Sequence, residues 1–128
     1  MTVMPLKGLR ILIVEDDYYL ATDTRAVIEE AGGQVVGPFG TAEQARAALD
    51  AGGADLAVID INLGSGPAFE LARHLDSAKL PFLFATGYDH ATVPDDLKDI
   101  VRLEKPFRPA DLITAAASVH QAATAGQA

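Results

Sequence analysis

The stretch LAVIDINL, residues 56–63, decides the fold that this chain is expected to adopt. Apolar residues fill positions 56–59, and an aspartate, Asp60, follows them directly. A short run without polar residues is typical of a strand that is buried on both faces, as in a parallel sheet. A carboxylate that closes such a strand needs an explanation, because an unpaired buried charge is costly.

Strand-like and helix-like segments alternate along the rest of the chain. Apolar runs predict strands over residues 10–14, 34–39, 55–60, 81–86 and 100–104. Helices are predicted over residues 18–32, 42–52, 66–78 and 109–123, with a weaker one over 91–99. Pro94 should shorten or break that weaker helix, and Pro38 favours an edge position for its strand. This alternation predicts an α/β fold with a parallel sheet between helices.

Composition and charge exclude several classes of protein. The chain has 128 residues, the size of one domain, and 49% of them are hydrophobic. A formal net charge of -8 argues against binding to nucleic acid. The absence of cysteine excludes disulfides and thiolate metal sites and suits a cytoplasmic protein. No apolar run has the length of a signal peptide or a membrane helix, so no membrane interaction is expected.

The carboxyl ends of the predicted strands carry a coherent set of polar side chains. Parallel strands end at one edge of the sheet, where open α/β folds bind their ligands. That edge is expected to collect Glu15, Asp16, Asp17, Asp60, Thr86 and Lys105. Each of these residues alone would more often be a cap, a turn residue or a solvated charge. Together, the carboxylates repel one another unless a cation joins them, and all-oxygen ligands favour Mg²⁺ over zinc.

Four motifs together resemble the receiver domain of bacterial two-component response regulators. They are RILIVEDD (10–17), LAVIDINL (56–63), FLFATGY (82–88) and LEKPF (103–107). The resemblance covers about residues 8–120 of a chain that reads as one receiver domain, 1–128. It implies a flavodoxin-like fold, with a five-stranded parallel sheet in the order 2-1-3-4-5 sandwiched by five helices.

The resemblance implies that Asp60 is the phosphoacceptor of a phosphorelay. A histidine kinase or a histidine phosphotransfer protein would supply the phosphoryl group, and a carboxylate oxygen of Asp60 would attack its phosphorus. Glu15 and Asp16 correspond to the acidic pair that holds Mg²⁺. Asp60 and the backbone carbonyl of Asn62 would complete this metal site.

The resemblance also implies the groups that stabilise the transferred phosphoryl group. Thr86 corresponds to the hydroxyl that hydrogen-bonds a phosphoryl oxygen, and Lys105 to the lysine that pairs with the phosphoryl charge. Pro106 corresponds to a proline that is often cis. The reaction then depends on positioning and charge and needs no general base.

Two positions depart from the common receiver pattern and are candidates for its conformational switch. Many receivers have a tyrosine or phenylalanine three residues before the lysine, where this chain has Arg102. FATG (84–87) resembles a subgroup of stand-alone regulators without that aromatic, although Tyr88 lies one residue earlier than their tyrosine. Tyr88 is expected either to close over the pocket or only to line its rim. Arg102 is expected at the surface, where it would meet an acidic group of a partner.

Two other functions fit the sequence less well, a phosphohydrolase and a receiver that only binds a partner. A phosphohydrolase of the haloacid dehalogenase kind would need an acidic residue where Asn62 lies. A degenerate receiver that only binds a partner would usually lack the acceptor, an acid or the lysine, and all are present.

The pattern therefore predicts a signalling phosphoprotein and no enzyme beyond self-phosphorylation from small donors and self-dephosphorylation. No output domain is expected, so signalling would occur by partner binding or by onward phosphotransfer as a shuttle or sink. The protein would be a monomer or a phosphorylation-dependent dimer.

Overall fold

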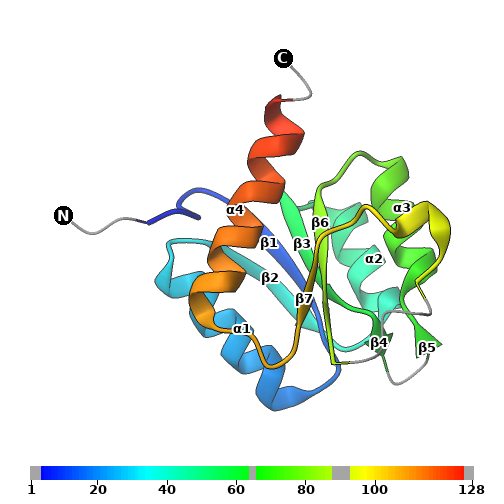
Figure 1. The fold of residues 1–128 in the computed structure, drawn as a ribbon, viewed down its shortest axis with the longest axis horizontal. Helices are drawn as coiled ribbons and strands as arrows, with labels where there is room; N and C mark the ends of the chain where they lie inside the picture. The colour runs from blue at the N-terminus through cyan, green and yellow to red at the C-terminus, as the bar shows by residue number, and fades with distance from the viewer. Residues whose placement is uncertain (1–3, 64–65, 88–92, 126–128) are drawn as a thin grey trace.

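A five-stranded parallel sheet forms the centre of the protein, with the strand order β2-β1-β3-β6-β7 (Figure 1). The computed structural model describes residues 4–63, 66–87 and 93–125. The sheet strands are β1 (Arg10–Val14), β2 (Gln34–Phe39), β3 (Leu56–Asp60), β6 (Phe82–Thr86) and β7 (Arg102–Glu104). In chain order this is the predicted 2-1-3-4-5 arrangement, and β2 with Pro38 is an edge strand, as predicted.

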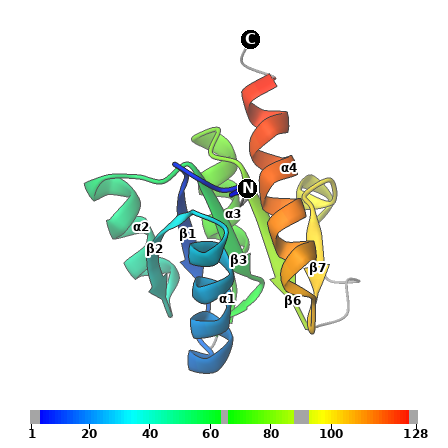
Figure 2. The ribbon, with the colours of Figure 1, turned by 90° about the vertical axis from the view of Figure 1, so that its left-hand side faces the viewer.

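Two helices cover each face of the sheet, as the two perpendicular views show (Figures 1 and 2). One layer holds α1 (Tyr18–Glu30) and α4 (Pro109–Ala125), and the other holds α2 (Ala42–Ala51) and α3 (Phe69–Ser77). The sheet is therefore buried on both sides. This is why every residue of β3 and of β6 is buried and why these strands contain only apolar residues up to their last position.

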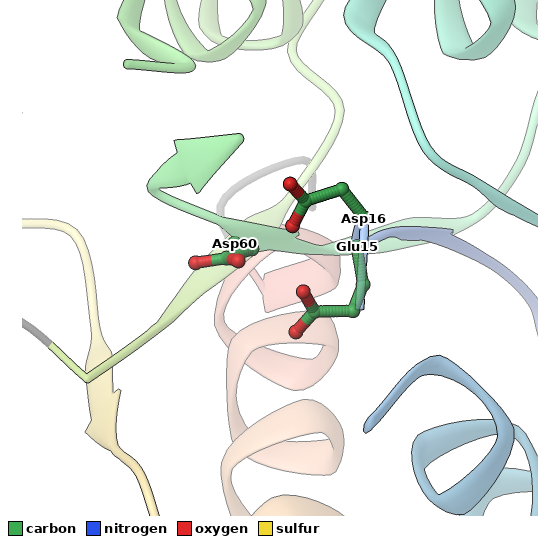
Figure 3. A group of neighbouring side chains, drawn as sticks. All are labelled: Glu15, Asp16 and Asp60. Carbon is green, nitrogen blue, oxygen red and sulfur yellow. The ribbon is translucent and has the colours of Figure 1, made fainter. Parts of the chain in front are cut away.

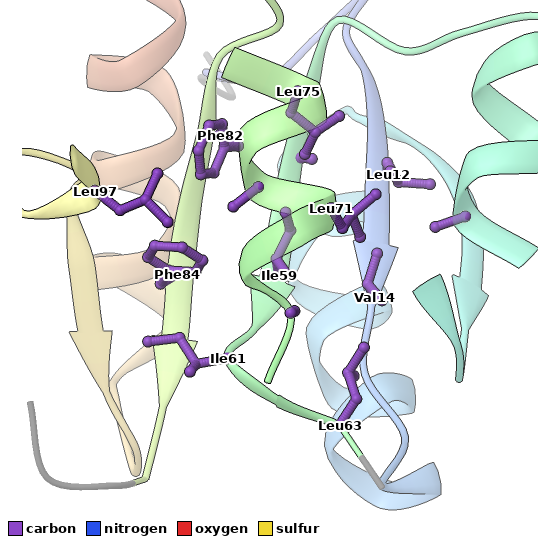
Figure 4. Packing of buried hydrophobic residues seen from close by; sticks show 14 of the residues in the cluster. Leu12, Val14, Ile59, Ile61, Leu63, Leu71, Leu75, Phe82, Phe84 and Leu97 are labelled. Carbon is purple, nitrogen blue, oxygen red and sulfur yellow. The ribbon is translucent and has the colours of Figure 1, made fainter. Parts of the chain in front are cut away.

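The alternating side chains of each strand divide the interior into two cores. Leu12, Val14 and Ile59 point towards α2 and α3 and pack with Leu71 and Phe84 (Figure 4). The intervening strand positions pack instead against α1 and α4, in a second cluster that contains Ile11, Ile13, Val58, Leu83, Ile28 and Leu112. Because successive side chains of a strand point to opposite faces, the two cores lie on opposite sides of the sheet and contain different side chains.

Side-chain caps fix where the first two helices begin. The carboxylate of Asp17 accepts a hydrogen bond from the N–H of Leu20 (3.0 Å) and so caps α1. Thr41 caps α2, because its hydroxyl accepts a hydrogen bond from the N–H of Gln44 (3.2 Å). Each bond satisfies a backbone donor that the first helical turn leaves without a partner. The cap on α1 also fixes the chain directly after Glu15 and Asp16.

The prediction of five helices is wrong for the part of the chain that is described. There, four α-helices are accompanied by a 3₁₀ helix, Asp95–Leu97, within the segment predicted as the weak helix. Pro94 precedes it in an extended conformation, with φ −60° and ψ 153°, and a proline has no N–H to continue a helix. Leu97 is almost completely buried and anchors this short turn to the core.

A small hairpin that the sequence does not predict separates β3 from α3. Strands β4 (Asn62–Leu63) and β5 (Gly66–Pro67) pair in antiparallel fashion. As a result α3 begins at Phe69, three residues later than predicted. Among the described residues, no helix combines the length and the apolar composition that crossing a membrane requires.

Candidate functional site

Three carboxylates from two neighbouring strands meet at the carboxyl edge of the sheet. Glu15 and Asp16 follow β1, and Asp60 ends β3 (Figure 3). The register pairs Val14 with Ile59, which brings the next residues of both strands to the same level. One oxygen of each carboxylate lies within 4.8 Å of the others, so the three could share one cation.

Lys105 supplies the positive charge of this cluster. Its Nζ donates a hydrogen bond to Oε1 of Glu15 (2.5 Å) and lies 3.4 Å from Oδ2 of Asp60. Glu15 and Asp60 are buried, at 8% and 7% exposure, whereas Asp16 is exposed. The cluster thus has one ammonium for three carboxylates, two of which are shielded from water. This excess of negative charge is the condition under which a divalent cation binds well.

Backbone donors hold two of the carboxylates in place. Oδ1 of Asp60 accepts from the N–H of Asn62 (3.1 Å), and Oε2 of Glu15 accepts from the N–H of Asp17 (3.2 Å). Asn62 therefore lies beside Asp60, and its position at the start of β4 is fixed by the pairing with β5. The expected role of its backbone carbonyl as a metal ligand stays a prediction.

Thr86 and Lys105 are brought to the site by the neighbouring strands β6 and β7. Asp60 pairs with Ala85 in the register of β3 and β6, so Thr86 follows directly at the edge and is 1% exposed. The backbone N–H of Lys105 donates to the carbonyl of Thr86 (2.8 Å), which ties these two residues together. The Lys105–Pro106 peptide bond is cis, as the resemblance implied.

Burial raises the pKa of Glu15 from 4.5 to about 7. The hydrogen bond from Lys105 lowers this pKa and the nearby carboxylate of Asp60 raises it, but loss of solvation is the largest cause. Glu15 therefore retains its proton far more readily than an exposed glutamate when no metal is bound.

The raised pKa of Glu15 predicts that stability falls as the pH rises from 4.5 to about 7. In this window the unfolded chain has released the proton and the folded chain retains it, so the folded state binds more protons. The loss is complete above the folded pKa and amounts to about 3 kcal/mol at most. Urea unfolding in EDTA across this window should show the fall in the wild type. Glu15→Gln should lack that part of the slope, and identical slopes for both proteins would contradict the assignment.

Not every predicted site residue is brought to this edge. Arg102, expected at the surface, is half-buried on β7, and its Nη1 is buried without a hydrogen-bond partner in the described part of the chain. Tyr88, the other switch candidate, lies outside the described residues. The structure therefore brings Glu15, Asp16, Asp60, Thr86 and Lys105 to one edge of the sheet, and their roles and the switch stay predictions.

Two features of the site have no clear signal in the sequence. The first is the hydrogen bond that Lys105 donates to Glu15. The other is a cavity of about 440 Å³ that extends from Asp60 and Lys105 between the sheet and α1. Small side chains such as Ala85 line it, and only the fold brings them together.

The pattern of one protein family, described as the response regulator receiver domain, matches residues 11–117. The chain belongs to this family. Receiver domains are signalling proteins, and the acidic cluster of this receiver lies where the family normally binds Mg²⁺. The all-oxygen donor set of Glu15, Asp16 and Asp60 fits that ion.

Known proteins similar to this receiver agree with the assignment. The transcriptional regulatory protein PdtaR of Mycobacterium tuberculosis is 26% identical over 110 residues, which cover 83% of this chain. The chain spans about half the length, 54%, of that curated relative. The solution structure of SdrG from Sphingomonas melonis is 32% identical, with a TM-score of 0.77 and coverage of 93% of this chain and 98% of SdrG. A receiver protein from Sinorhizobium medicae is 28% identical, with a TM-score of 0.77 and coverage of 90% and 96%.

Proposed function

We propose that this receiver accepts a phosphoryl group on Asp60 from a phosphohistidine, in a reaction that depends on Mg²⁺. The observation that carries the proposal is the convergence of Glu15, Asp16 and Asp60 within 4.8 Å, with the ammonium of Lys105 beside them. The donor would be a histidine kinase or a histidine phosphotransfer protein. This makes the chain a phosphoprotein of a two-component phosphorelay.

In the proposed step, a carboxylate oxygen of Asp60 bonds to the phosphorus while the bond from phosphorus to the histidine nitrogen breaks. Glu15, Asp16, Asp60 and the backbone carbonyl of Asn62 would hold Mg²⁺, which neutralises phosphoryl charge when bound. The N–H of Asn62 holds Oδ1 of Asp60 and so restricts the rotation of the carboxylate.

Lys105 and Thr86 have the remaining roles in the proposed reaction. The ammonium of Lys105, 3.4 Å from Asp60, would turn from Glu15 towards the incoming phosphoryl oxygens. The hydroxyl of Thr86, buried at the adjacent strand end, would donate to one of those oxygens. Both residues act through charge and hydrogen bonding, so the chemistry requires no general base.

The proposed output is binding to a protein partner or onward transfer of the phosphoryl group. The expectation of a cytoplasmic location belongs to this proposal and is supported by a chain without cysteine. Dephosphorylation of its own Asp60 is the catalytic activity that the proposal includes.

One observation favours an alternative, a receiver that acts only as a binding module. Lys105 is hydrogen-bonded to Glu15 and lies farther from Asp60, so its charge is already partly neutralised. A phosphohydrolase of the haloacid dehalogenase kind has no such support, because residue 62 is an asparagine and cannot protonate a leaving group.

A labelling experiment distinguishes these functions. The chain is mixed with radiolabelled acetyl phosphate, or with a histidine kinase that carries labelled phosphohistidine, in Mg²⁺ or in EDTA. The proposal expects label on the chain in Mg²⁺ and very little in EDTA. No label in either condition indicates the binding module, and rapid release of phosphate from unrelated phosphate esters indicates the hydrolase.

Asp16→Asn is expected to stabilise the metal-free protein and to weaken its response to Mg²⁺. Removing one of three crowded carboxylates should raise the melting temperature of the metal-free protein by about 3 °C. The rise that saturating Mg²⁺ produces in the wild type should largely disappear, because the ion loses an exposed ligand and stabilises by binding only the folded state. Thermal melts with EDTA or Mg²⁺ measure both effects. Asp50→Asn, an exposed control on α2, should respond to Mg²⁺ like the wild type, and an unchanged Mg²⁺ response in Asp16→Asn would exclude Asp16 as a ligand.

A further inference from the structure

The cavity that extends from Asp60 and Lys105 lies on the face of the sheet that α1 and α4 cover. Alternate side chains of the strands point to this face and form the floor of the cavity. They include Ile13, Glu15, Val58, Asp60 and Ala85. Glu15 points to this side, away from Asp16, which directly follows it (Figure 3). Two buried carboxylates therefore end a floor that is otherwise apolar.

Two segments of the chain form the walls of the cavity. Most of the α1 residues that line it recur at intervals of three or four and so share one face of the helix. They are Leu20, Asp23, Thr24, Val27 and Glu30. The opposite wall is the segment that leads from β7 into α4, with Pro106, Phe107 and Pro109. The walls enclose about 440 Å³, a volume typical of pockets that hold small organic molecules.

The charges that line the cavity do not balance. Glu15 and Asp60 are buried at its inner end, and Asp23 and Glu30 are exposed at its rim. Lys105 is the one cation that lines it in the part of the chain that the structure describes. Its ammonium is shared between Glu15 and Asp60, so the buried end has one more carboxylate than it has cations. One further positive charge would balance the two buried carboxylates.

We propose that this cavity binds an organic amine with one ammonium group and an apolar body, and that the amine competes with Mg²⁺. The ammonium would lie beside Glu15 and Asp60 and donate charge-assisted hydrogen bonds to their oxygens. The apolar body would extend along the floor and walls, where it would pack against Val58, Ala85 and Phe107. The ligand thus places its charge at the acidic end and its apolar surface against the apolar part of the cavity.

The distribution of charge selects this class of ligand over others. An organic anion would have to pair with Lys105 against two buried carboxylates and a net charge of -8. A polyamine would carry further charges along its length and would have to place them against the apolar walls, where an unpaired charge is costly. A neutral molecule would leave the excess carboxylate without a cation. An amine with a single terminal charge meets all three conditions.

Binding of the amine would oppose phosphorylation, and this part of the inference rests on the proposed function. Glu15 and Asp60 are two of the three carboxylates that could share a cation, so the amine and Mg²⁺ need the same oxygens. Two cations repel each other strongly where water is largely excluded. Each therefore lowers the affinity of the other, and this effect is reciprocal. The amine would keep the receiver in its metal-free, unphosphorylated form.

An NMR titration of the isotope-labelled protein tests the binding. The titration is done in EDTA at a pH above the raised pKa of Glu15, so that its carboxylate is charged. Phenylbutylamine, phenylbutanol and phenylbutyrate share one apolar body and differ in their end group. We expect the amine to bind about tenfold or more tightly than the alcohol, and the butyrate to bind no better than the alcohol. The largest shifts of amide signals should lie at Val27 and Ala85.

Matched variants on α1 identify the cavity as the site. Thr24 is half-buried and lines the cavity, so Thr24→Leu should fill part of it and weaken amine binding by about tenfold. Thr22→Leu makes the same change at an exposed position outside the cavity lining and should bind the amine like the wild type. The inference is overturned if the amine does not bind, if the alcohol binds as tightly, or if Thr24→Leu binds the amine unchanged.

Competition with Mg²⁺ is measured in the same titration. Saturating Mg²⁺ should weaken amine binding to the wild type by about tenfold. Asp16 does not line the cavity but is a candidate ligand of the metal. Asp16→Asn should therefore keep the affinity for the amine and lose most of the effect of Mg²⁺. Equal amine affinity of the wild type with and without Mg²⁺ would overturn the competition.

The effect on phosphorylation has its own readout. Labelling by acetyl phosphate in Mg²⁺ should slow when phenylbutylamine is added, and Thr24→Leu should be labelled like the wild type and resist the amine. Binding of the amine without slower labelling would overturn its role as an inhibitor. A chain that is never labelled, with or without the amine, would refute the proposed function, whereas the NMR titration would still decide whether the cavity binds amines.

Discussion

Asp60→Asn is expected to abolish phosphorylation from both acetyl phosphate and a phosphorylated kinase. The amide has almost the shape of the carboxylate, so the fold and the bond to the N–H of Asn62 should persist. It lacks the anionic oxygen that attacks phosphorus and contributes one charge less to the metal site. Loss of the nucleophile should reduce the rate by about three orders of magnitude or more. Intact mass after incubation with Mg²⁺ measures the phosphoryl gain directly.

The burial of the site makes this result informative. Asp60 is 7% exposed and its Oδ1 is held by a backbone donor, so the substitution removes one carboxylate oxygen of fixed position. Asp50→Asn, which removes an exposed carboxylate from α2, should be phosphorylated like the wild type. A full phosphoryl gain in Asp60→Asn would place the acceptor elsewhere, and equal gains in Mg²⁺ and EDTA would remove the metal from the proposal.

Lys105→Met is expected to have the second largest effect, on stability as well as on phosphorylation. In the wild type, Nζ of Lys105 lies 2.5 Å from Oε1 of Glu15 and 3.4 Å from Oδ2 of Asp60. The substitution removes this ammonium from both carboxylates. Removing one partner of a buried ion pair destabilises by about 3–5 kcal/mol, and partial exposure of Lys105 favours the lower end, about 3 kcal/mol. Phosphorylation should slow by about 10²–10³-fold, as when one charge-stabilising donor is removed. Urea unfolding and the rate of phosphoryl gain measure these effects.

A second substitution shows whether the loss in Lys105→Met comes from unpaired carboxylates. Glu15→Gln combined with Lys105→Met should be more stable than the sum of the single effects predicts, because the amide removes the charge that the lysine neutralised. Mg²⁺ should also restore part of the stability of Lys105→Met. Additive effects of the two substitutions, with no response to Mg²⁺, would mean that Lys105 stabilises the protein through its packing alone.

The strands and the edge that they share could be predicted from the sequence because their signals are local. An apolar run such as residues 56–59 is typical of a strand buried on both faces, and the alternation of such runs with helices indicates a parallel sheet between helices. Once the strands are parallel, the residues that follow them meet at one edge. Asp60, Glu15 and Lys105 could therefore be assigned to one site without coordinates.

The remaining features depend on contacts between distant residues. Strands β4 and β5 have two residues each, too few for any periodic pattern. Burial of Leu97, not local propensity, holds the 3₁₀ turn. The contact of Lys105 with Glu15 joins residues 90 positions apart. The partial burial of Arg102 likewise depends on the folded surroundings of β7, which the sequence of β7 does not reveal.

The division of the interior into two cores has a consequence for residues that are adjacent in the sequence. Leu12 and Ile13 share a peptide bond, yet one packs with α2 and α3 and the other with α1 and α4. A cavity made at Leu12 weakens the packing of α2 and α3, and a cavity made at Ile13 weakens the packing of α1 and α4. The hydrogen-bonded sheet lies between the two cavities. Sequence distance is therefore a poor guide to which residues pack together in this protein. Leu12 and Ile13 belong to different packed clusters, whereas Leu12 and Leu75, 63 positions apart, belong to the same one.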